Sequence, residues 1–272
     1  MKFTYYTIIG KNPELLQGHI ENTKFHAGFD RLSCEKEFIC IVYTNPSIPK
    51  ETTSKILDIC KKYDVRPVLF EEKTNNFLHN LYSCWNLGYE ASDDGWVFRS
   101  GSDEFHNFDS LVKIYDIANN LYKLGQTKIL YNCNTIEHSI RAAGKSRHLM
   151  ANFGDTFQDF NVYEFENYVK KLNENVDKEL LSINDCIKYW NKPDVFRSLY
   201  YGPGHNRTEG TSWLITKEDW LKHGPMNLGV VDGWATGDMV FHDILERNGY
   251  RDYAVRDAVA FHLFRGESFE RY

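Results

Sequence analysis

Apolar and polar residues alternate along the first ~130 residues in blocks that are typical of strands and helices in turn. Strand-like runs rich in β-branched and aromatic residues cover Phe3–Ile9, Phe38–Tyr43, Arg66–Phe70 and Trp96–Phe98. Three stretches between and after these runs have apolar residues at helical spacing: Ile56, Ile59, Cys60 and Tyr63; Leu78, Leu81, Tyr82 and Trp85; and Leu111, Ile114, Tyr115, Ala118, Leu121 and Tyr122. This alternation predicts a mostly parallel, doubly wound α/β sheet, in which ligands bind beyond the carboxyl ends of the strands.

The second half of the chain has a less regular pattern. Residues 142–192 are polar and charged, with a helical stretch around Tyr163–Leu181 and no clear strand signal. Because no linker rich in Pro, Gly or Ser precedes this segment, we interpret it as an insertion within one domain. A predicted strand at Gly210–Thr216, a helix at Asp238–Asn248 and a strand at Tyr253–Phe264 then follow.

Composition limits the kinds of partner. Of 272 residues, 42% are hydrophobic and 26% are charged, and the net charge is −6, so the chain has no general basic footprint for nucleic acid. The longest apolar run, Phe38–Tyr43, is far shorter than the ~20 residues of a membrane span, and the first residues form no apolar signal core. We therefore expect a cytoplasmic protein with no transmembrane segment and no nucleic-acid partner.

Several common chemical motifs are absent from the sequence. It contains no phosphate-binding P-loop, dinucleotide fingerprint, nucleophile elbow or H-E-x-x-H pair. The six cysteines form no close pair, and we expect them to be reduced core residues. His19 and His26 lie seven residues apart, and we interpret them as a solvated pair rather than as metal ligands. The enzyme classes that depend on these motifs are thereby excluded.

Three remaining segments have polar residues at positions where an α/β enzyme has its catalytic and metal-binding residues. The Val97–Phe105 segment passes from an apolar strand into a small-residue turn with Asp103 and Glu104, whose carboxylates suit Mg²⁺ or Mn²⁺. Asp238 begins a predicted helix, and His262 is the single imidazole of an apolar strand. Each also has a plain structural interpretation: a solvated turn, a helix-capping acid and a core histidine.

Taken together, the order of these segments resembles that of GT-A fold glycosyltransferases, especially the large inverting family of nucleotide-sugar transferases. The residues that carry the resemblance are Tyr6–Asn12, Ile41–Asn45, Asn75–Gly88, Gly101–Glu104 at the D-x-D signature, Gly210–Trp220, Gly237-Asp238 at the acidic helix start, and His262 with Ser268. Two positions depart from the family pattern. Gly101 replaces the first aspartate of D-x-D, and Gly237 replaces the first acid of the E-D pair.

This resemblance implies a GT-A-like, doubly wound mixed sheet with a Rossmann-like nucleotide-binding half and a helical insertion. Residues 1–272 would form a single domain. Within it, residues 1–130 would be the nucleotide-sugar-binding half, 142–192 the insertion and 194–272 the acceptor and catalytic half.

The resemblance also implies an activity, the transfer of a sugar from a nucleotide-diphosphate sugar donor to a glycan or other hydroxyl acceptor, with inversion. Mn²⁺ or Mg²⁺ at Asp103 and His262 would stabilise the leaving diphosphate, and Asp238 would deprotonate the acceptor as general base. If Asp238 only caps its helix, Asp232 or Glu209 would be the base. Donor-binding positions implied in the same way are Ile9, Gly10, Asn45, Ser102 and Asp103. Trp213, Trp234 and Tyr201 could stack on sugar rings or could be ordinary core or surface residues.

Two other functions stay open on the sequence alone. A nucleotidyltransferase on a similar sheet would release pyrophosphate instead of a nucleoside diphosphate. A non-catalytic sugar- or nucleotide-binding protein on the same fold is the other alternative, which Gly101 in the D-x-D position makes conceivable.

Overall fold

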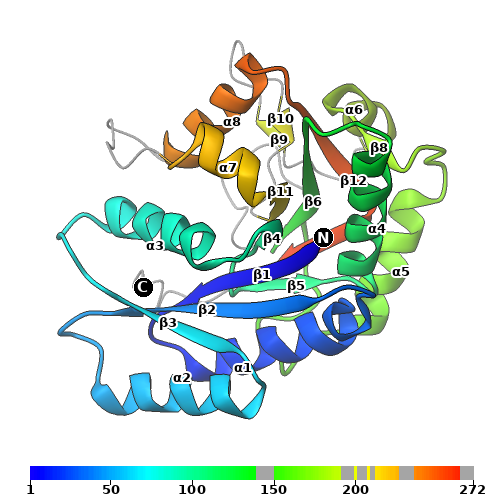
Figure 1. Cartoon of the computed structure of the whole chain (residues 1–272). Helices are drawn as coiled ribbons and strands as arrows, with labels where there is room; N and C mark the ends of the chain where they lie inside the picture. The colour runs from blue at the N-terminus through cyan, green and yellow to red at the C-terminus, as the bar shows by residue number, and fades with distance from the viewer. Residues whose placement is uncertain (139–149, 191–198, 201–206, 209–211, 227–235, 264–272) are drawn as a thin grey trace.

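The computed structural model describes residues 1–138, 150–190, 199–200, 207–208, 212–226 and 236–263 (Figure 1). The elements in chain order are β1 (Lys2–Ile9), α1 (Pro13–Glu21), the π-helix η1 (Asn22–His26), the 3₁₀-helix η2 (Phe29–Arg31), β2 (Lys36–Thr44), α2 (Lys50–Lys62), β3 (Arg66–Glu71), α3 (Phe77–Ala91), β4 (Gly95–Arg99), β5 (Glu104–His106), α4 (Ser110–Lys123), β6 (Ile129–His138), β7 (Met150–Ala151), α5 (Val162–Asn173), β8 (Leu180–Leu181), α6 (Ile183–Trp190), β9 (Leu199–Tyr200), β10 (Arg207–Thr208), β11 (Trp213–Thr216), α7 (Lys217–His223), α8 (Thr236–Arg247) and β12 (Arg251–His262).

A mixed sheet crosses the whole molecule in the order β3-β2-β1-β4-β11-β6-β12-β5, with β7 beside β6 and β8 beside β12. Strands β3, β2, β1 and β4 are mutually parallel, whereas β11 runs antiparallel to both of its neighbours, β4 and β6. β12 is parallel to β6 and antiparallel to β5. The sheet is therefore mixed, and its parallel half is the N-terminal half predicted from the sequence.

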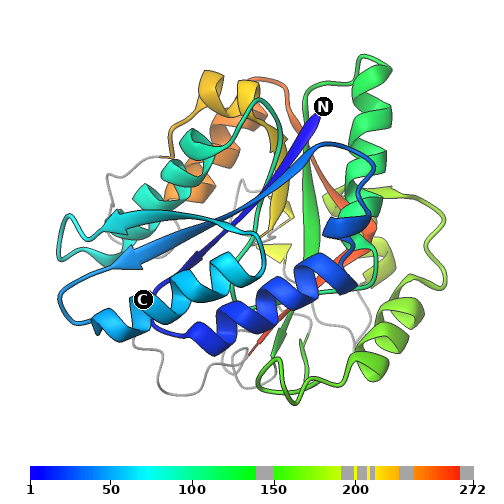
Figure 2. The same ribbon diagram turned by 60° about the horizontal axis from the view of Figure 1, so that its bottom comes forward.

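Helices cover both faces of this sheet, as Figures 1 and 2 show from two directions. Helices α1, α2 and α4 pack on one face, and α3, α7 and α8 pack on the other. Helices α5 and α6 cover the outer part that contains β12 and β5. Strand β1 is consequently buried on both sides, which explains why most of its residues are apolar or aromatic.

The N-terminal elements agree with the sequence pattern because each has clear end signals. Asn12 caps α1 by accepting a hydrogen bond from Leu15 N at 2.9 Å, with Pro13 in the first turn. Asn76 caps α3 in the same way, through His79 N at 3.1 Å. Gly125 takes a positive φ of 80° just after α4. The four strands and three helices predicted in this half are all present.

Two predictions in the second half are wrong. The helix predicted around Tyr163–Leu181 ends at Asn173, and Leu180–Leu181 forms β8 against β12. The segment 142–192 is therefore not purely helical, since β7 and β8 extend the main sheet. Strands β5 and β6 were not predicted. β6 contains buried polar residues, among them Asn132, which obscure the apolar pattern of a central strand.

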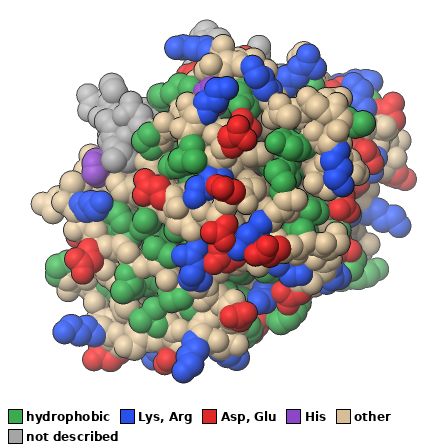
Figure 3. All heavy atoms as spheres, in the orientation of Figure 1, with side chains coloured by type: hydrophobic (Ala, Val, Ile, Leu, Met, Phe, Trp, Pro, Cys, Tyr) green, Lys and Arg blue, Asp and Glu red, His purple; other side chains and the backbone are tan. Residues whose placement is uncertain are grey.

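The described surface is mixed in charge. On the face seen in Figure 3, Lys and Arg side chains are interspersed with Asp and Glu. Within the described ranges, every helix is too short or too polar to cross a lipid bilayer.

Candidate active site

The turn after β4 starts at the centre of the sheet. Trp96, Val97 and Phe98 are buried between the two helical layers, and Ser100 N continues the pairing with β1 by donating to Tyr6 O at 3.1 Å. The chain then turns through Gly101 and Ser102 into β5. Because β4 is parallel to β1, and β1 to β2, this turn lies at the end of the sheet where β1 and β2 also end.

The structure brings Asp103 and His262 into direct contact. His262 Nε2 lies 2.8 Å from Asp103 Oδ2, although 159 positions separate the two residues. Both side chains are more than nine-tenths buried, with 5% of Asp103 and 7% of His262 exposed. The backbone reinforces this contact, because Leu263 N donates to Asp103 O at 2.9 Å and β12 pairs with β5 at His262 and Glu104. His262 is thus at the end of a strand beside a carboxylate, rather than alone among apolar groups.

Glu104 is a second, fully buried carboxyl group at this turn. Its Oε2 accepts hydrogen bonds from Ser100 Oγ at 2.8 Å, from Gly101 N at 3.2 Å and from Ser212 Oγ. Burial raises the pKa of Glu104, while the His262 charge and the Ser212 hydrogen bond oppose that rise.

A buried polar cluster lies behind the turn. Ser100 Oγ is 2.9 Å from His106 Nε2, and Tyr5 OH lies 3.4 Å from the same nitrogen and 2.8 Å from His19 Nε2. His19 Nδ1 in turn contacts Glu104 O at 3.1 Å. Burial lowers the pKa of His106 to about 3, so its imidazole is neutral at ordinary pH.

The prediction of a solvated His19–His26 pair is wrong for His19, which is fully buried in this cluster. Its partners, Tyr5 and the Glu104 carbonyl, come from other elements and replace water. His26 is partly exposed, and its Nε2 lies 2.8 Å from Glu166 Oε1.

Two buried polar atoms at the turn have no hydrogen-bond partner among the described residues, namely Ser102 Oγ and Glu104 Oε1. Each of these two atoms is available for a hydrogen bond or for contact with an ion or ligand. A carboxylate, an imidazole and a hydroxyl together are ligand types that Mg²⁺ or Mn²⁺ accepts. The residues present therefore fit a divalent ion, although no cluster of three or more His, Cys, Asp or Glu side chains is found in the described ranges.

The residues predicted to contact the donor lie where the parallel strands end. Ile9 ends β1, and Gly10 follows it, both buried. Asn45 follows β2 and is partly exposed; its Oδ1 accepts from Ser47 N at 2.8 Å and from Ser47 Oγ at 2.6 Å. The side-chain carbonyl of Asn45 thus shapes the turn after β2.

Helix α8 begins at Thr236, so Asp238 is in its first turn rather than at its start. The Asp238 side chain lies outside the described part of the structure. Several other positions singled out in the sequence also lie outside the described residues: Tyr201, Glu209, Asp232, Trp234 and Ser268.

One buried cation beside this turn was not found from the sequence. Arg99 ends β4 with 4% of its surface exposed, and its guanidinium carbon lies 4.0 Å from the Trp85 ring centroid and 3.8 Å from that of Trp213. Trp213 is therefore a core residue that holds a cation, and its indole N–H donates to Tyr89 OH at 2.6 Å. A lone arginine after an apolar run gives no sequence signal for such a double cation–π contact.

The body of α8 is anchored by a second polar pair. His242 Nδ1 lies 3.1 Å from Asp252 Oδ2 of β12, and the His242 ring contacts the edge of Trp213 at a centroid distance of 4.9 Å. Asn132 Nδ2 also donates to Asp252. These contacts fix the helix that carries Asp238 against the sheet.

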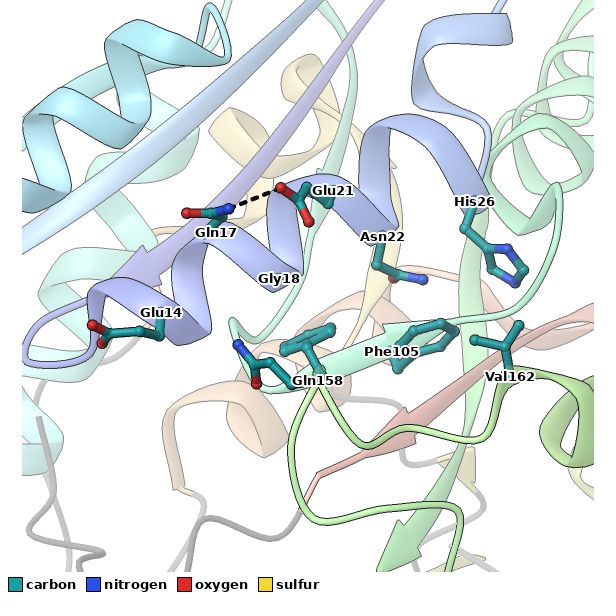
Figure 4. Close-up of a pocket in the computed structure, with 10 residues that line it drawn as sticks. Glu14, Gln17, Gly18, Glu21, Asn22, His26, Phe105, Gln158 and Val162 are labelled. Carbon is teal, nitrogen blue, oxygen red and sulfur yellow. Dashed lines mark hydrogen bonds between the residues drawn. The ribbon is translucent and has the colours of Figure 1, made fainter.

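A separate pocket of about 420 Å³ lies between α1 and the segment that precedes α5 (Figure 4). Glu14, Gln17, Glu21 and His26 line one side, and Phe105 and Val162 line the other. None of the residues predicted to bind donor, metal or acceptor lines this pocket.

Comparisons with known proteins place this geometry in a structural class. No protein-family profile matches the sequence, and no curated protein is similar to it. Solved structures do match. The chain is similar to GalNAc-T7, crystallised with UDP, GalNAc and Mn²⁺, with a TM-score of 0.59 and 9% identity over 100% of this chain and 44% of that one. It is also similar to TarS of S. aureus, with a TM-score of 0.54 and 12% identity over 97% of this chain and 37% of that one.

A third similar structure is the mannosyltransferase PcManGT from Pyrobaculum calidifontis with GDP-Man and Mn²⁺, which has a TM-score of 0.54 and 12% identity over 98% of this chain and 58% of that one. The chain thus spans less than two thirds of each of these proteins. It has the GT-A fold, as the sequence resemblance implied.

Proposed function

We propose that the protein is a glycosyltransferase that moves a sugar from a nucleotide-diphosphate sugar to a hydroxyl acceptor. The observation that carries this proposal is the buried contact of Asp103 with His262, 2.8 Å apart, at the ligand-binding edge of a GT-A sheet. Two of the similar structures were crystallised with nucleotide or nucleotide sugar and Mn²⁺.

Asp103 and His262 would hold Mn²⁺ or Mg²⁺, and the Ser102 hydroxyl faces no described partner that would prevent it from joining them. A bound ion of this kind supplies Lewis-acid stabilisation of the departing diphosphate. Burial of both ligands excludes water and strengthens their interaction with a cation. Gly101 leaves the site with fewer carboxylates than D-x-D provides, which favours a metal that binds best together with the nucleotide.

Ile9, Gly10 and Asn45 would contact the nucleotide, because they stand at the ends of β1 and β2 on the same edge as the Asp103 turn. Asp238 would take the proton of the acceptor hydroxyl. Asp238 belongs to the first turn of α8, and an acid in the first turn of a helix is stabilised in its ionised form by the helix dipole, as a base requires. In-line attack assisted by a single base inverts the anomeric centre.

A panel of nucleotide sugars with Mn²⁺, with released nucleotide as the readout, tests this proposal. We expect nucleoside diphosphate from at least one donor, lost on chelation of the metal and in Asp103→Asn. Asp116→Asn, an exposed carboxylate on α4, is the matched control and should behave as the unmodified chain.

Other products would overturn the proposal in distinct ways. Pyrophosphate in place of nucleoside diphosphate would identify a nucleotidyltransferase. Donor binding without any release from any donor would identify a non-catalytic binding protein, the alternative that Gly101 makes conceivable.

A further inference from the structure

Gly101, at the position of the first D-x-D aspartate, lies against a neighbouring carboxyl group. A Cβ atom added to Gly101 would lie 3.5 Å from both Cγ and Cδ of Glu104 and 2.8 Å from Asp103 Oδ1. A side chain at position 101 would therefore contact the carboxyl groups of both Asp103 and Glu104. Two carboxyl groups therefore border this space, those of Asp103 and Glu104, and Glu104 supplies the second carboxyl group of the turn where position 101 has none.

We propose that Glu104 is a positioning residue that replaces the missing carboxylate of position 101, holding the turn and supplying negative charge behind the metal ligands. This inference rests on the proposed function, because it assumes a divalent ion at Asp103 and His262.

The hydrogen bonds of Glu104 support the positioning role. Its Oε2 accepts from Gly101 N and Ser100 Oγ within the turn, and from Ser212 Oγ beside β11. One oxygen atom thus ties the start of the turn to its end and to the neighbouring strand. Since Asp103 lies between these anchors, its carboxylate is fixed toward His262.

The other oxygen of Glu104 supports the electrostatic role. Oε1 is buried and has no hydrogen-bond partner among the described residues. A buried anion that lacks full compensation is costly, and a nearby cation removes that cost. The Glu104 carboxyl group interacts electrostatically with both Asp103 and His262, so an ion held by these two residues would also act on this charge. Groups behind the ligands of a metal commonly change its affinity by about 10–100-fold.

The metal affinity of a Glu104 variant distinguishes a purely structural role from an electrostatic one. Glu104→Gln keeps the shape of the side chain and removes its charge. If Glu104 only fills and connects the turn, this variant should bind metal as the unmodified chain does. If its charge acts on the metal, the variant should fold normally and bind metal more weakly.

The decisive experiment measures Mn²⁺ affinity from the electron paramagnetic resonance signal of free Mn²⁺, with no donor and no turnover. We expect about 10-fold or greater weakening in Glu104→Gln and Glu104→Ala. Gly101→Asp alone should also weaken binding, because the new side chain meets Asp103 Oδ1. In the Glu104→Ala background, Gly101→Asp should restore the affinity to within a few-fold of the unmodified chain.

Circular dichroism and thermal melting would check folding, with Asp116→Asn as the matched control. Unchanged Mn²⁺ affinity in Glu104→Gln, or no rescue by Gly101→Asp in a folded double variant, would overturn the inference. An unmodified chain that binds no Mn²⁺, either alone or together with a nucleoside diphosphate, would overturn both this inference and the metal site. Binding that depends on Glu104 but releases no nucleotide from any donor would overturn the proposed transfer alone.

Discussion

Individual buried polar residues account for much of the local order around the candidate site. His106 has no exposed surface, yet its Nε2 lies 2.9 Å from Ser100 Oγ and its backbone pairs with the Asn22 amide at 2.8 and 3.0 Å. Leaving such a group unpaired would cost about 1–3 kcal/mol. The cluster therefore holds β5 and the turn before it in one arrangement.

The same burial makes stability depend on pH. His106 has a pKa of about 3 in the folded chain against an ordinary value of 6.5, so below pH 6.5 the unfolded chain takes up a proton that the folded chain does not. Acidification then favours unfolding, by about 2 kcal/mol from this group between pH 7 and pH 5. Urea denaturation at both pH values should show His106→Gln losing less stability on acidification than the unmodified chain by about that amount. An equal loss in both chains would contradict the assignment.

A substitution of Arg99 measures how much its cation–π contacts contribute to stability. Its guanidinium lies between two tryptophan rings, and lysine has neither the planar shape nor the weak hydration that suit this position. Arg99→Lys should lower the free energy of unfolding by about 2 kcal/mol, as expected for a desolvated cation–π contact. Arg247→Lys, exposed on α8, is the control in the same urea titration. Equal stability of Arg99→Lys and the unmodified chain would mean that the rings contribute little.

Among the elements, those with a regular apolar pattern and clear ends could be predicted, and those that carry buried polar groups could not. β1 and β2 are mostly apolar because helices cover both faces. β6 is just as central, but Asn132 belongs to a polar contact with Asp252 that only the folded chain creates. β5 has three residues, too few for any period to be visible.

At the scale of elements, helix α8 allows a prediction about catalysis, because it contains Asp238 in its first turn. His242–Asp252 and the buried Phe241 and Leu245 hold this helix on the sheet, so a substitution in its first turn should leave the fold intact. Asp238→Asn keeps the size of the side chain and removes the base. We expect the transfer rate to fall by roughly 10²–10⁴ with donor affinity little changed. Rates with saturating donor and direct donor binding separate these two effects.

Glu246→Gln, an exposed acid on the same helix, is the control for that experiment. Near-normal turnover of Asp238→Asn would leave Asp238 with a capping role only. The search for the base would then move to Asp232 and Glu209.

At the scale of the whole molecule, the candidate site depends on distant parts of the chain. Asp103 and His262 could be selected from their local sequences and the family resemblance, each at the end of an apolar run. Their contact is a property of the sheet, because β12 returns from the far end of the chain to pair with β5. The cluster of Tyr5, His19 and His106 has no such signal, since its members come from three separate elements and none has a distinctive neighbour in sequence.

The sheet order also predicts how the chain can be divided. β11 lies between β4 and β6, pairing Trp213 with Arg99 on one side and with Asn132 on the other. A fragment of residues 1–190 would lose this strand and β12, which leaves one edge of β4 unpaired and β6 paired only with the short β7, and exposes the face that α7 and α8 cover. We therefore expect residues 1–272 to fold as one domain and the fragment 1–190 to lack a cooperative melt. Calorimetry of both chains is the measurement, and the full chain should give a single transition. A cooperative transition in the fragment would show that the N-terminal half is an independent domain.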